Sequence, residues 1–369
     1  MAVIAVDARE LAGHRTGVGR YLLELLRRWS GDGGKQPESD LALAAARHRF
    51  VLYSHAPLPA DVPFLRHEVV LAGDGGTRWE QTVFARALRQ ERPDVLFAPG
   101  GTAPLLVTTK LVVAIHDLSY MAHPEWFRWR EGVRRRLSTR LAVRKASAVL
   151  TGSAFSASEI VERLGVPRDR VHVTHYGGPD PENPESDSKE RLVLFVGSIF
   201  NRRRVPDLIR AFSHVVQRLP DARLVIVGEN RTYPAEDPEA LAQSLGTGDR
   251  VEIRGYASDT EIASLYARAA VFAFISEYEG FGFTPLEAMA RGAAVVVADT
   301  PLSREIYGRA AVRVALGDVP ALAEAISTLL EQPEHRRAVA ALGRDVVAMY
   351  SWDRTAADTL LVLERAARA

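Results

Sequence analysis

The sequence predicts an α/β protein made of two domains, each built on a parallel sheet. Short apolar runs typical of strands alternate with longer segments typical of helices, which is the pattern of parallel α/β folds. The chain has 369 residues, which is long for one domain and sufficient for two. A polar stretch rich in proline and acidic residues, residues 177–190, separates the two halves. We therefore expect domains at 1–180 and 191–350, a linker at 181–190 and a terminal helix at 351–369.

In the first half, apolar runs predict strands and the segments between them predict helices. The expected strands are 2–6, 48–54, 68–72, 95–98, 111–115, 148–151 and 171–175. The expected helices are one after Thr16 with Leu22, Leu25, Leu26 and Trp29 on one face, then 79–90, 126–145, and one that begins with a Ser156–Glu159 capping box and ends at Gly165.

The second half shows the same alternation. The expected strands are 192–196, 223–227, 251–253, 271–275 and 293–298, and the expected helices are 205–219, 259–269, 321–330, 335–349 and 350–368. A further helix follows the strand at 271–275. Thr284 is its expected N-cap, Pro285 suits its first position, and Gly292 follows its last turn.

The composition excludes several classes of protein. The formal net charge is +1, so the chain as a whole has no electrostatic preference for nucleic acid. The absence of cysteine excludes disulfides, thiolate metal sites and a cysteine nucleophile. The first residues lack a basic start followed by a long apolar core, and no apolar run approaches the length of a membrane span. A cytoplasmic location is the default expectation.

A glycine-rich loop before the helix at Thr284 is the most informative feature. Gly280 and Gly282 leave backbone N–H groups uncovered at a helix N-terminus, where phosphate binds well. Glu279 and Glu287 bracket this loop, and carboxylates accept hydrogen bonds from sugar hydroxyls. Each also has a simpler explanation, Glu287 as the capping-box partner of Thr284 and Glu279 as a solvated loop residue. The combination favours recognition of a nucleotide sugar.

The run Glu279–Gly280–Phe281–Gly282–Phe283, followed by Pro285–Leu286–Glu287–Ala288–Met289–Ala290 and Gly292, resembles the E-x7-E signature of retaining glycosyltransferases of family 4, in particular bacterial mannosyltransferase-like members. The resemblance implies the GT-B fold, in which two Rossmann-like domains with parallel sheets face a central cleft. It places the donor mainly on the second domain and the acceptor on the first, and it sends the terminal helix back across the first domain.

The resemblance also implies a reaction. A hexose, with mannose favoured, passes from a GDP- or UDP-linked donor to the hydroxyl of a glycan or lipid-linked acceptor, with retention at the anomeric carbon. Polysaccharide or glycoconjugate assembly is the expected setting. The sequence has no Asp-x-Asp motif in a suitable place, so we expect neither a metal nor a cofactor.

The resemblance assigns roles in the donor site. Glu279 is expected to hold the sugar hydroxyls, with His116 on the opposite wall, and Glu287 to hold the ribose. His116 ends the strand at 111–115, where ligands of parallel sheets gather, although a lone histidine is more often structural. Asp117 either orients His116 or caps the following turn. The amides of the loop, Gly280, Phe281, Gly282 and Phe283, are expected beside the diphosphate.

Three further contacts are implied, each with an alternative. Gly17 and Gly19 match a dinucleotide fingerprint poorly, because Leu22 replaces the third glycine; they either begin a helix or form the family's early glycine loop beside the diphosphate. The family's phosphate-binding lysine is replaced by Arg203, and the contact stays open among Arg202, Arg203 and Arg204. Tyr256 follows a strand beside the expected nucleobase.

Residues 126–145 form a strongly basic stretch in which eight arginines and lysines oppose Glu131 alone. With Trp126, Phe127 and Trp129 at one end, it suits a helix on a membrane surface, and it equally suits a helix whose basic side chains extend into solvent. On the acceptor domain, a peripheral contact with the inner face of a membrane agrees with a lipid-linked or phosphorylated acceptor.

Other functions share this architecture. A sugar-nucleotide epimerase would bind the same donor without an acceptor. A binding protein without turnover would need a damaged catalytic set, whereas Glu279, Glu287 and His116 are all present. A dehydrogenase is disfavoured by the defective glycine fingerprint.

Overall fold

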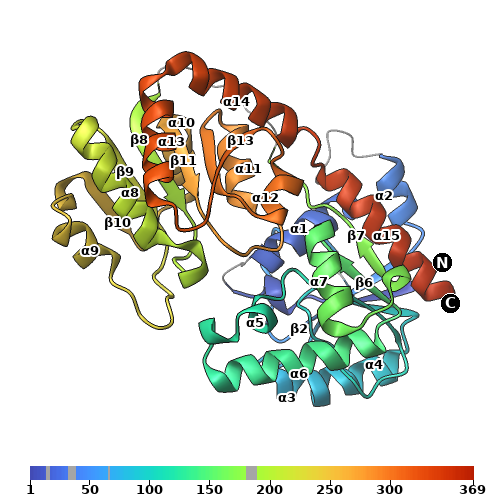
Figure 1. Cartoon of the computed structure of the whole chain (residues 1–369). Coiled ribbons are helices and arrows are strands. Elements are labelled where there is room, and N and C mark those ends of the chain that lie inside the picture. The colour runs from blue at the N-terminus through green and yellow to red at the C-terminus, as the bar shows by residue number, and fades with distance from the viewer. Residues whose placement is uncertain (14–16, 32–38, 65–66, 180–188) are drawn as a thin grey trace. The chain divides into compact units, whose positions relative to one another are not determined.

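The computed structural model describes the chain except residues 14–16, 32–38, 65–66 and 180–188 (Figure 1). The chain divides into two compact units. Unit 1 comprises Met1–Ala122, Trp129–Gly177 and Ser351–Ala369, and unit 2 comprises His123–Arg128 and Gly178–Tyr350. Most of the predicted linker lies outside the described residues. Its last predicted position, Glu190, already belongs to a strand of unit 2, so the linker ends earlier than the sequence suggested.

Unit 1 is built on a parallel sheet. Among the described residues this sheet has seven strands in the order β3-β2-β1-β4-β5-β6-β7. They are β1 (Val3–Asp7), β2 (Arg49–Ser54), β3 (Glu68–Val70), β4 (Val95–Ala98), β5 (Lys110–Ala114), β6 (Ala148–Thr151) and β7 (Val171–Val173). All were expected from the sequence, and their ends differ from prediction by two residues at most. The strand order reverses between β1 and β4, and the crevice outside such a reversal is where ligands of parallel sheets bind.

Helices and short turns connect these strands. They are η1 (Arg9–Leu11), α1 (Gly17–Ser30), α2 (Asp40–Ala45), α3 (Thr77–Trp79), the π-helical η3 (Glu80–Phe84), α4 (Ala85–Glu91), α5 (Ser119–Ala122), α6 (Trp129–Lys145), α7 (Ala154–Leu164) and η5 (Arg168–Arg170), together with η4 (Pro124–Trp126), which groups with unit 2. The expected helix 126–145 therefore begins at Trp129, because η4 and extended Phe127 precede it.

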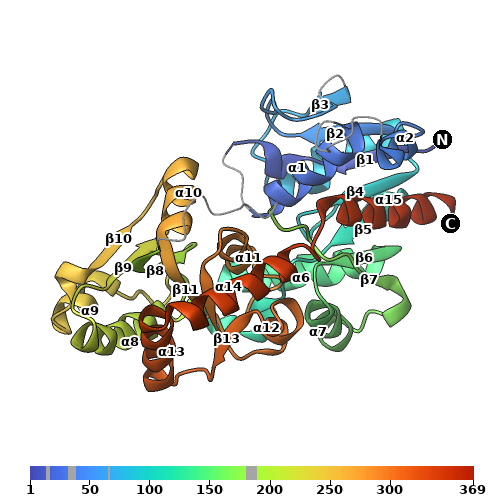
Figure 2. The same cartoon turned by 90° about the horizontal axis from the view of Figure 1, so that it is seen from above.

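The C-terminal helix α15 (Trp352–Arg368) is part of unit 1, although the chain passes through unit 2 before reaching it. It packs against α1 and over β4 and β5 (Figure 2). The indole N–H of Trp29 donates to the carbonyl of Ala356 at 3.1 Å. Leu360 and Leu363 are buried, so the apolar side of α15 completes the core of unit 1.

Unit 2 repeats the architecture. Within the described part of the chain its parallel sheet has six strands in the order β10-β9-β8-β11-β12-β13. They are β8 (Glu190–Val196), β9 (Arg223–Val227), β10 (Val251–Arg254), β11 (Ala269–Phe274), β12 (Ala294–Ala298) and β13 (Ala311–Val314). β11 and β12 are fully buried, because helices cover both faces of a parallel sheet. β13 was not predicted from the sequence, because it is short and two of its residues are partly buried or exposed.

The helices of unit 2 are η6 (Asn201–Arg203), α8 (Val205–Arg218), α9 (Pro238–Ser244), η7 (Gly248–Arg250), α10 (Asp259–Arg268), α11 (Phe283–Ala290), α12 (Pro301–Ile306), α13 (Val319–Glu331) and α14 (Pro333–Val347). α8 packs against α13, and α11 against α14. The chain leaves α14 and enters α15 two residues later than predicted, because Ser351 is the N-cap and accepts from Asp353 N–H.

Two predicted helix N-caps are wrong. The N-cap of α11 is Gly282, so Thr284 lies within the first turn and forms no capping box with Glu287. Gly282 can end the loop because its φ of +85° suits glycine. The N-cap of α7 is Ser153, which accepts from Ser156 N–H at 3.0 Å. The helix expected after Thr16 does begin at Gly17, so Gly17 and Gly19 lie in the first turn of α1.

In the described residues, no helix combines the length and the apolar character that crossing a membrane demands.

Candidate active site

The loop that follows β8 in unit 2 places Arg203 against the end of that strand. Gly197 directly follows β8 and has a φ of +136°, and a side chain there would place its Cβ 2.3 Å from Nη1 of Arg203. The absence of a side chain at this position lets Arg203 donate to the carbonyl of Ser198 at 2.9 Å. The guanidinium also lies over the ring of Phe274 of β11, 5.0 Å from its centroid.

Arg203 is paired with Glu279, the first glutamate of the E-x7-E signature. Its Nε donates to Oε1 of Glu279 at 2.9 Å, and the Ser276 hydroxyl donates to the same oxygen at 3.0 Å. The side chains of the pair are 14% and 13% exposed. Burial raises the pKa of Glu279, but Arg203, Arg202 and the two hydrogen bonds outweigh it, so the pKa lies below its ordinary value of 4.5. Glu279 is therefore a fixed, ionised carboxylate.

The neighbouring arginines differ in direction. Arg202 lies over the ring of Phe200, 4.3 Å from its centroid, and its Nε is 3.7 Å from Oε1 of Glu279. Arg204 adopts a positive φ of 48° and pairs instead with Asp207 at 2.7 Å and with Glu277 at 3.0 Å. The structure thus brings Arg202 and Arg203 together at Glu279 and directs Arg204 to other carboxylates.

The loop that follows Glu279 is held by a tyrosine that the sequence analysis did not identify. The hydroxyl of Tyr307 donates to the carbonyl of Gly282 at 2.9 Å. A Cβ at Gly282 would lie 2.0 Å from the hydroxyl oxygen of Tyr307, so a side chain there would displace the tyrosine as well as strain the backbone. Phe281 packs edge-on against Tyr350 with centroids 5.4 Å apart. These contacts fix the backbone just before the N-terminus of α11.

Glu287 projects from α11 toward another unpredicted partner. The hydroxyl of Tyr266, near the end of α10, donates to Oε2 of Glu287 at 3.1 Å. The structure therefore replaces the expected capping bond from Thr284 with a bond from a side chain 21 residues earlier. Tyr266 and Tyr307 carry no local sequence signal, because each reaches the site only through the fold. Tyr256, the expected neighbour of the nucleobase, follows β10 and is exposed.

The other predicted site residues lie in unit 1. His116 follows β5, and its ring nitrogens lie 2.8 Å from the carbonyl of Pro99 and 2.7 Å from the hydroxyl of Tyr176. Burial lowers the pKa of His116, despite opposing effects of the Pro99 carbonyl and Asp117. Asp117 accepts from the N–H and the hydroxyl of Ser119, so it caps the following turn. Gly19 is buried in the first turns of α1.

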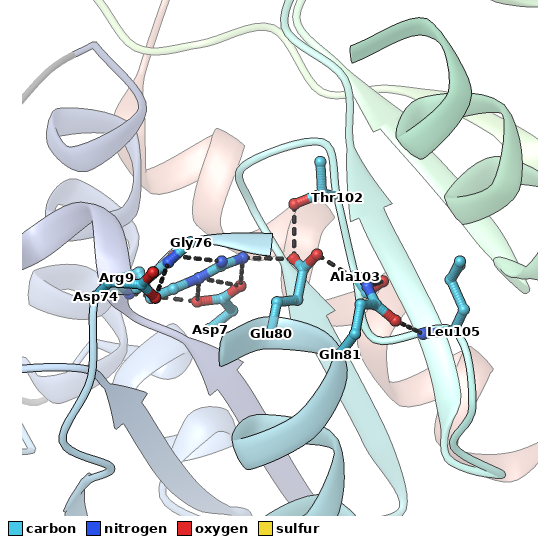
Figure 3. Close-up of polar contacts among 10 residues, drawn as sticks. Asp7, Arg9, Asp74, Gly76, Glu80, Gln81, Thr102, Ala103 and Leu105 are labelled. Carbon is cyan, nitrogen blue, oxygen red and sulfur yellow. Dashed lines mark hydrogen bonds and ion pairs between the residues drawn. The ribbon is translucent and has the colours of Figure 1, made fainter. Parts of the chain in front are cut away.

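A buried charge cluster in unit 1 was also missed (Figure 3). Arg9 donates from Nε to Asp7 at 2.9 Å and from Nη2 to Glu80 at 2.6 Å, and its Nη1 donates to the carbonyl of Gly75. Thr102 donates to the Oε1 of Glu80 at 2.7 Å. Asp7 ends β1, beside the reversal of the strand order, so the cluster fastens the loops around this edge of the sheet.

The cluster has a structural role at this edge of the sheet and does not form a binding site. Asp7 and Glu80 are 3% and 2% exposed, and their oxygens already accept hydrogen bonds from Arg9, Gln81 and Thr102. Only Asp7 and Arg9 are close in sequence. The charged pair Asp7 and Arg9 beside a strand was therefore the one local sign of this cluster in the sequence. Glu80 lies 71 positions after Arg9, so its part in the cluster was not visible.

Comparisons with known proteins show the family of the chain. The family model "Glycosyl transferase 4-like domain" matches residues 16–177, and "Glycosyl transferases group 1" matches residues 179–346. The O-antigen chain mannosyltransferase B of Escherichia coli is 26% identical over 94% of this chain and 95% of its own length.

Solved structures share the fold. Sucrose-phosphate synthase from Thermosynechococcus elongatus has a TM-score of 0.73 at 19% identity and covers 99% of each chain. HepE from Anabaena, in complex with UDP and glucose, has a TM-score of 0.71 at 20% identity over 100% of this chain and 99% of its own. Two Rossmann-like domains with parallel sheets define the GT-B class of glycosyltransferases. Within that class the chain belongs to the family 4 type, and it resembles bacterial mannosyltransferases.

Proposed function

We propose that the protein transfers a hexose from a nucleoside diphosphate sugar to an acceptor hydroxyl, with retention at the anomeric carbon. The observation that carries this proposal is the buried, ionised Glu279 held by Arg203 immediately before the N-terminus of α11. A carboxylate that accepts from hydroxyls thus adjoins two features that attract phosphate, a guanidinium and the N-terminus of a helix.

Some atoms of Arg203 and Glu279 form the hydrogen bonds that hold the pair, and we assign the other polar atoms to the donor. Arg203 uses Nε and Nη1 for Glu279 and Ser198, so Nη2 carries the N–H groups that we assign to the diphosphate. Both hydrogen bonds to Glu279 fall on Oε1, so Oε2 is the oxygen that we assign to the sugar hydroxyls. We assign Arg202 and the amides of Gly280, Phe281, Gly282 and Phe283 to the diphosphate as well.

The remaining donor contacts follow the family pattern. We assign Glu287, which Tyr266 orients, to the ribose hydroxyls, and Tyr256 to the surroundings of the base. From unit 1 we assign Gly17 and Gly19 to the diphosphate, through the N-terminal turns of α1, and His116 to the transferred sugar. The arginines and helix N-termini supply the positive charge that a departing diphosphate needs, so we propose a reaction without a metal.

The donor and the acceptor are proposed from the relatives. Mannose is favoured because the Escherichia coli relative is named as an O-antigen chain mannosyltransferase, and that name also supports a role in polysaccharide assembly. HepE was solved with UDP and glucose, so we propose a UDP-linked donor as the alternative to a GDP-linked one. The acceptor is proposed to be a glycan or a lipid-linked sugar.

A panel of nucleotides tests the proposal. We expect one of UDP, GDP, ADP and dTDP to raise the melting temperature, with and without EDTA, while NAD does not. A ligand at a hundred times its dissociation constant adds about 2.7 kcal/mol of stability. Stabilisation by NAD alone would contradict the assignment of Glu279 and Glu287, and a diphosphate effect abolished by EDTA would contradict the metal-free reaction.

We further propose that α6 contacts an anionic membrane surface. Trp129, Val133 and Leu137 recur every four residues along one side and are 75%, 38% and 57% exposed. Arg130, Arg134 and Arg140 are exposed on the same helix. Apolar side chains that can enter the interface, flanked by cations, form the pattern of a helix lying on a membrane.

The membrane proposal predicts salt-dependent pelleting with vesicles that contain phosphatidylserine. A basic residue near such a surface contributes about 1 kcal/mol, so Arg134→Glu with Arg140→Glu should weaken binding at least about tenfold. Arg250→Glu with Arg309→Glu changes the same charge at exposed positions of unit 2 and is the matched control. Equal losses for both pairs, or no pelleting of the unaltered protein at low salt, would discard the proposal.

A further inference from the structure

The hydrogen bonds of His116 determine which of its nitrogens carries the proton. Nε2 lies 2.8 Å from the carbonyl oxygen of Pro99, which can only accept, so Nε2 bears the hydrogen. Nδ1 of the neutral ring is then an acceptor, and the Tyr176 hydroxyl, 2.7 Å away, donates to it. The two bonds together specify one tautomer of an uncharged imidazole.

Tyr176 is suited to this role by its own surroundings. It is 2% exposed, and burial raises its pKa well above the ordinary value, so its hydroxyl keeps its proton. Its ring stacks on Trp352 with an interplanar angle of 7° and lies 4.9 Å from the ring of Tyr21. A Cβ at Gly152 would lie 2.6 Å from the ring, so only glycine leaves room for it there.

The C-terminal helix contributes directly to this arrangement. Trp352 is the first residue of α15, and Thr355 one turn later donates to the carbonyl of His175 at 2.6 Å. The first turn of α15 is therefore fastened to the segment that carries Tyr176. Three residues distant in sequence, His116, Tyr176 and Trp352, form one continuous contact within unit 1.

We propose that Tyr176 is a positioning residue for His116, and that its hydroxyl keeps the imidazole in the Nε2–H tautomer and without charge during sugar transfer. The proposal rests on the proposed function, in which His116 contacts the transferred sugar. A sugar that leaves its diphosphate develops positive charge in an oxocarbenium-like state, and an imidazolium beside it would oppose that charge. A donated hydrogen bond at Nδ1 occupies the lone pair that a proton would otherwise take.

Other charged groups near the ring do not account for its neutrality. Asp117, on the same segment, acts in the opposite direction and favours the protonated ring. Tyr21 packs edge-on against the imidazole, with centroids 5.2 Å apart, while the two ring nitrogens bond to Tyr176 and Pro99. Burial opposes a positive charge on His116, and we assign the same effect to the hydrogen bond that Tyr176 donates to Nδ1.

Tyr176→Phe in the full-length protein tests the proposal, because phenylalanine keeps the ring and removes only the donor. Nitrogen NMR of 15N-histidine-labelled protein, with the His116 signals assigned by His116→Gln, reports the tautomer and its titration. We expect the unaltered protein to show Nε2–H without protonation down to the lower end of its stable pH range. The variant should lose that single tautomer and protonate at higher pH. Tyr21→Phe, which removes a hydroxyl that bonds neither ring nitrogen, should leave His116 unchanged.

Transfer kinetics give the second readout. In Tyr176→Phe, kcat/KM should fall about tenfold for each pH unit below the new pKa of His116, while the unaltered protein shows no such limb. Unchanged His116 signals in the variant, or Nδ1–H in the unaltered protein, would overturn the positioning role. Altered signals with an unaltered pH profile would overturn the link to transfer and show that His116 is outside the reaction. The affinity for the donor diphosphate, measured separately, distinguishes a failure of the role proposed for Tyr176 and His116 from a failure of the proposed function.

Discussion

Glu279→Gln is expected to lower the turnover of sugar transfer by about a hundredfold or more, in the range seen when one preorganised polar group is removed from a transition state. Glutamine has nearly the same shape, but it lacks the charge that stabilises a positively charged sugar. Affinity for the nucleoside diphosphate should change little, because Arg202, Arg203 and the loop amides remain. The measurements are kcat for transfer and the dissociation constant of the diphosphate.

Glu277→Gln is the matched control for this prediction. Glu277 also pairs with an arginine in the same loop region, since its Oε2 accepts from Arg204 at 3.0 Å, but it lies outside the E-x7-E signature. It should retain most of its turnover. If both variants lose turnover equally, or if Glu279→Gln loses diphosphate affinity as severely as turnover, Glu279 has a general structural or binding role and the assignment to the sugar is wrong.

Arg203→Met should lower the free energy of unfolding by about 3–5 kcal/mol, which is the usual cost of breaking a buried ion pair from one side. Methionine keeps part of the apolar stem of the arginine, and it removes the charge together with the guanidinium that lies over the ring of Phe274. The variant should also bind the nucleoside diphosphate more weakly. Denaturant unfolding at neutral pH measures the first effect, and titration calorimetry measures the second.

The pH dependence of Arg203→Met has a definite sign. In the unaltered protein the pKa of Glu279 lies below 4.5, so its contribution to stability is present above about pH 4.5 and is lost as the pH falls through the folded-state pKa. Without Arg203, burial dominates and raises the pKa, so acid relieves the penalty of a buried charge. The stability difference between the two proteins should therefore shrink from pH 7 toward pH 4.

Arg204→Met is the control for the same loop. Its side chain is 35% exposed and its partners are Asp207 and Glu277, so we expect a loss of at most about 1 kcal/mol, as for exposed ion pairs. A loss of stability in Arg204→Met as large as that in Arg203→Met would show that any arginine of this loop is equally important. For Arg203→Met itself, a stability difference from the unaltered protein that does not change with pH would contradict the ionised state of Glu279.

The strands were predictable because each carries its signal locally. A run such as 294–298 is apolar at every position, since both faces of a parallel sheet are covered, and the pattern is visible without the partner strands. Glu279 and Glu287 were found for a similar reason, because seven residues separate them around a glycine loop. Helix starts were less predictable. Thr284 and Ser156 are good capping residues, but backbone geometry at Gly282 and Ser153 decides where the helices begin.

The partners of the site residues could not be predicted, because the fold alone brings them together. Arg203 reaches Glu279 across 76 positions, and Tyr266 reaches Glu287 across 21. Tyr176 lies 60 positions from His116 in a segment whose sequence suggests only the end of a strand. The sequence indicated candidate site residues from their chemistry, while the contacts that set their charge and orientation required the structure.

The most direct test of the account is the configuration of the sugar at its anomeric carbon after the reaction. Proton NMR should follow the protein with the donor selected by the nucleotide panel, in which the sugar is α-linked to the diphosphate, and with a mannose-containing acceptor. We predict that the first product carries an α-linked sugar and that Glu279→Gln slows its appearance. A β-linked first product would contradict retention, and an epimerised nucleotide sugar without transfer would contradict the glycosyltransferase assignment itself.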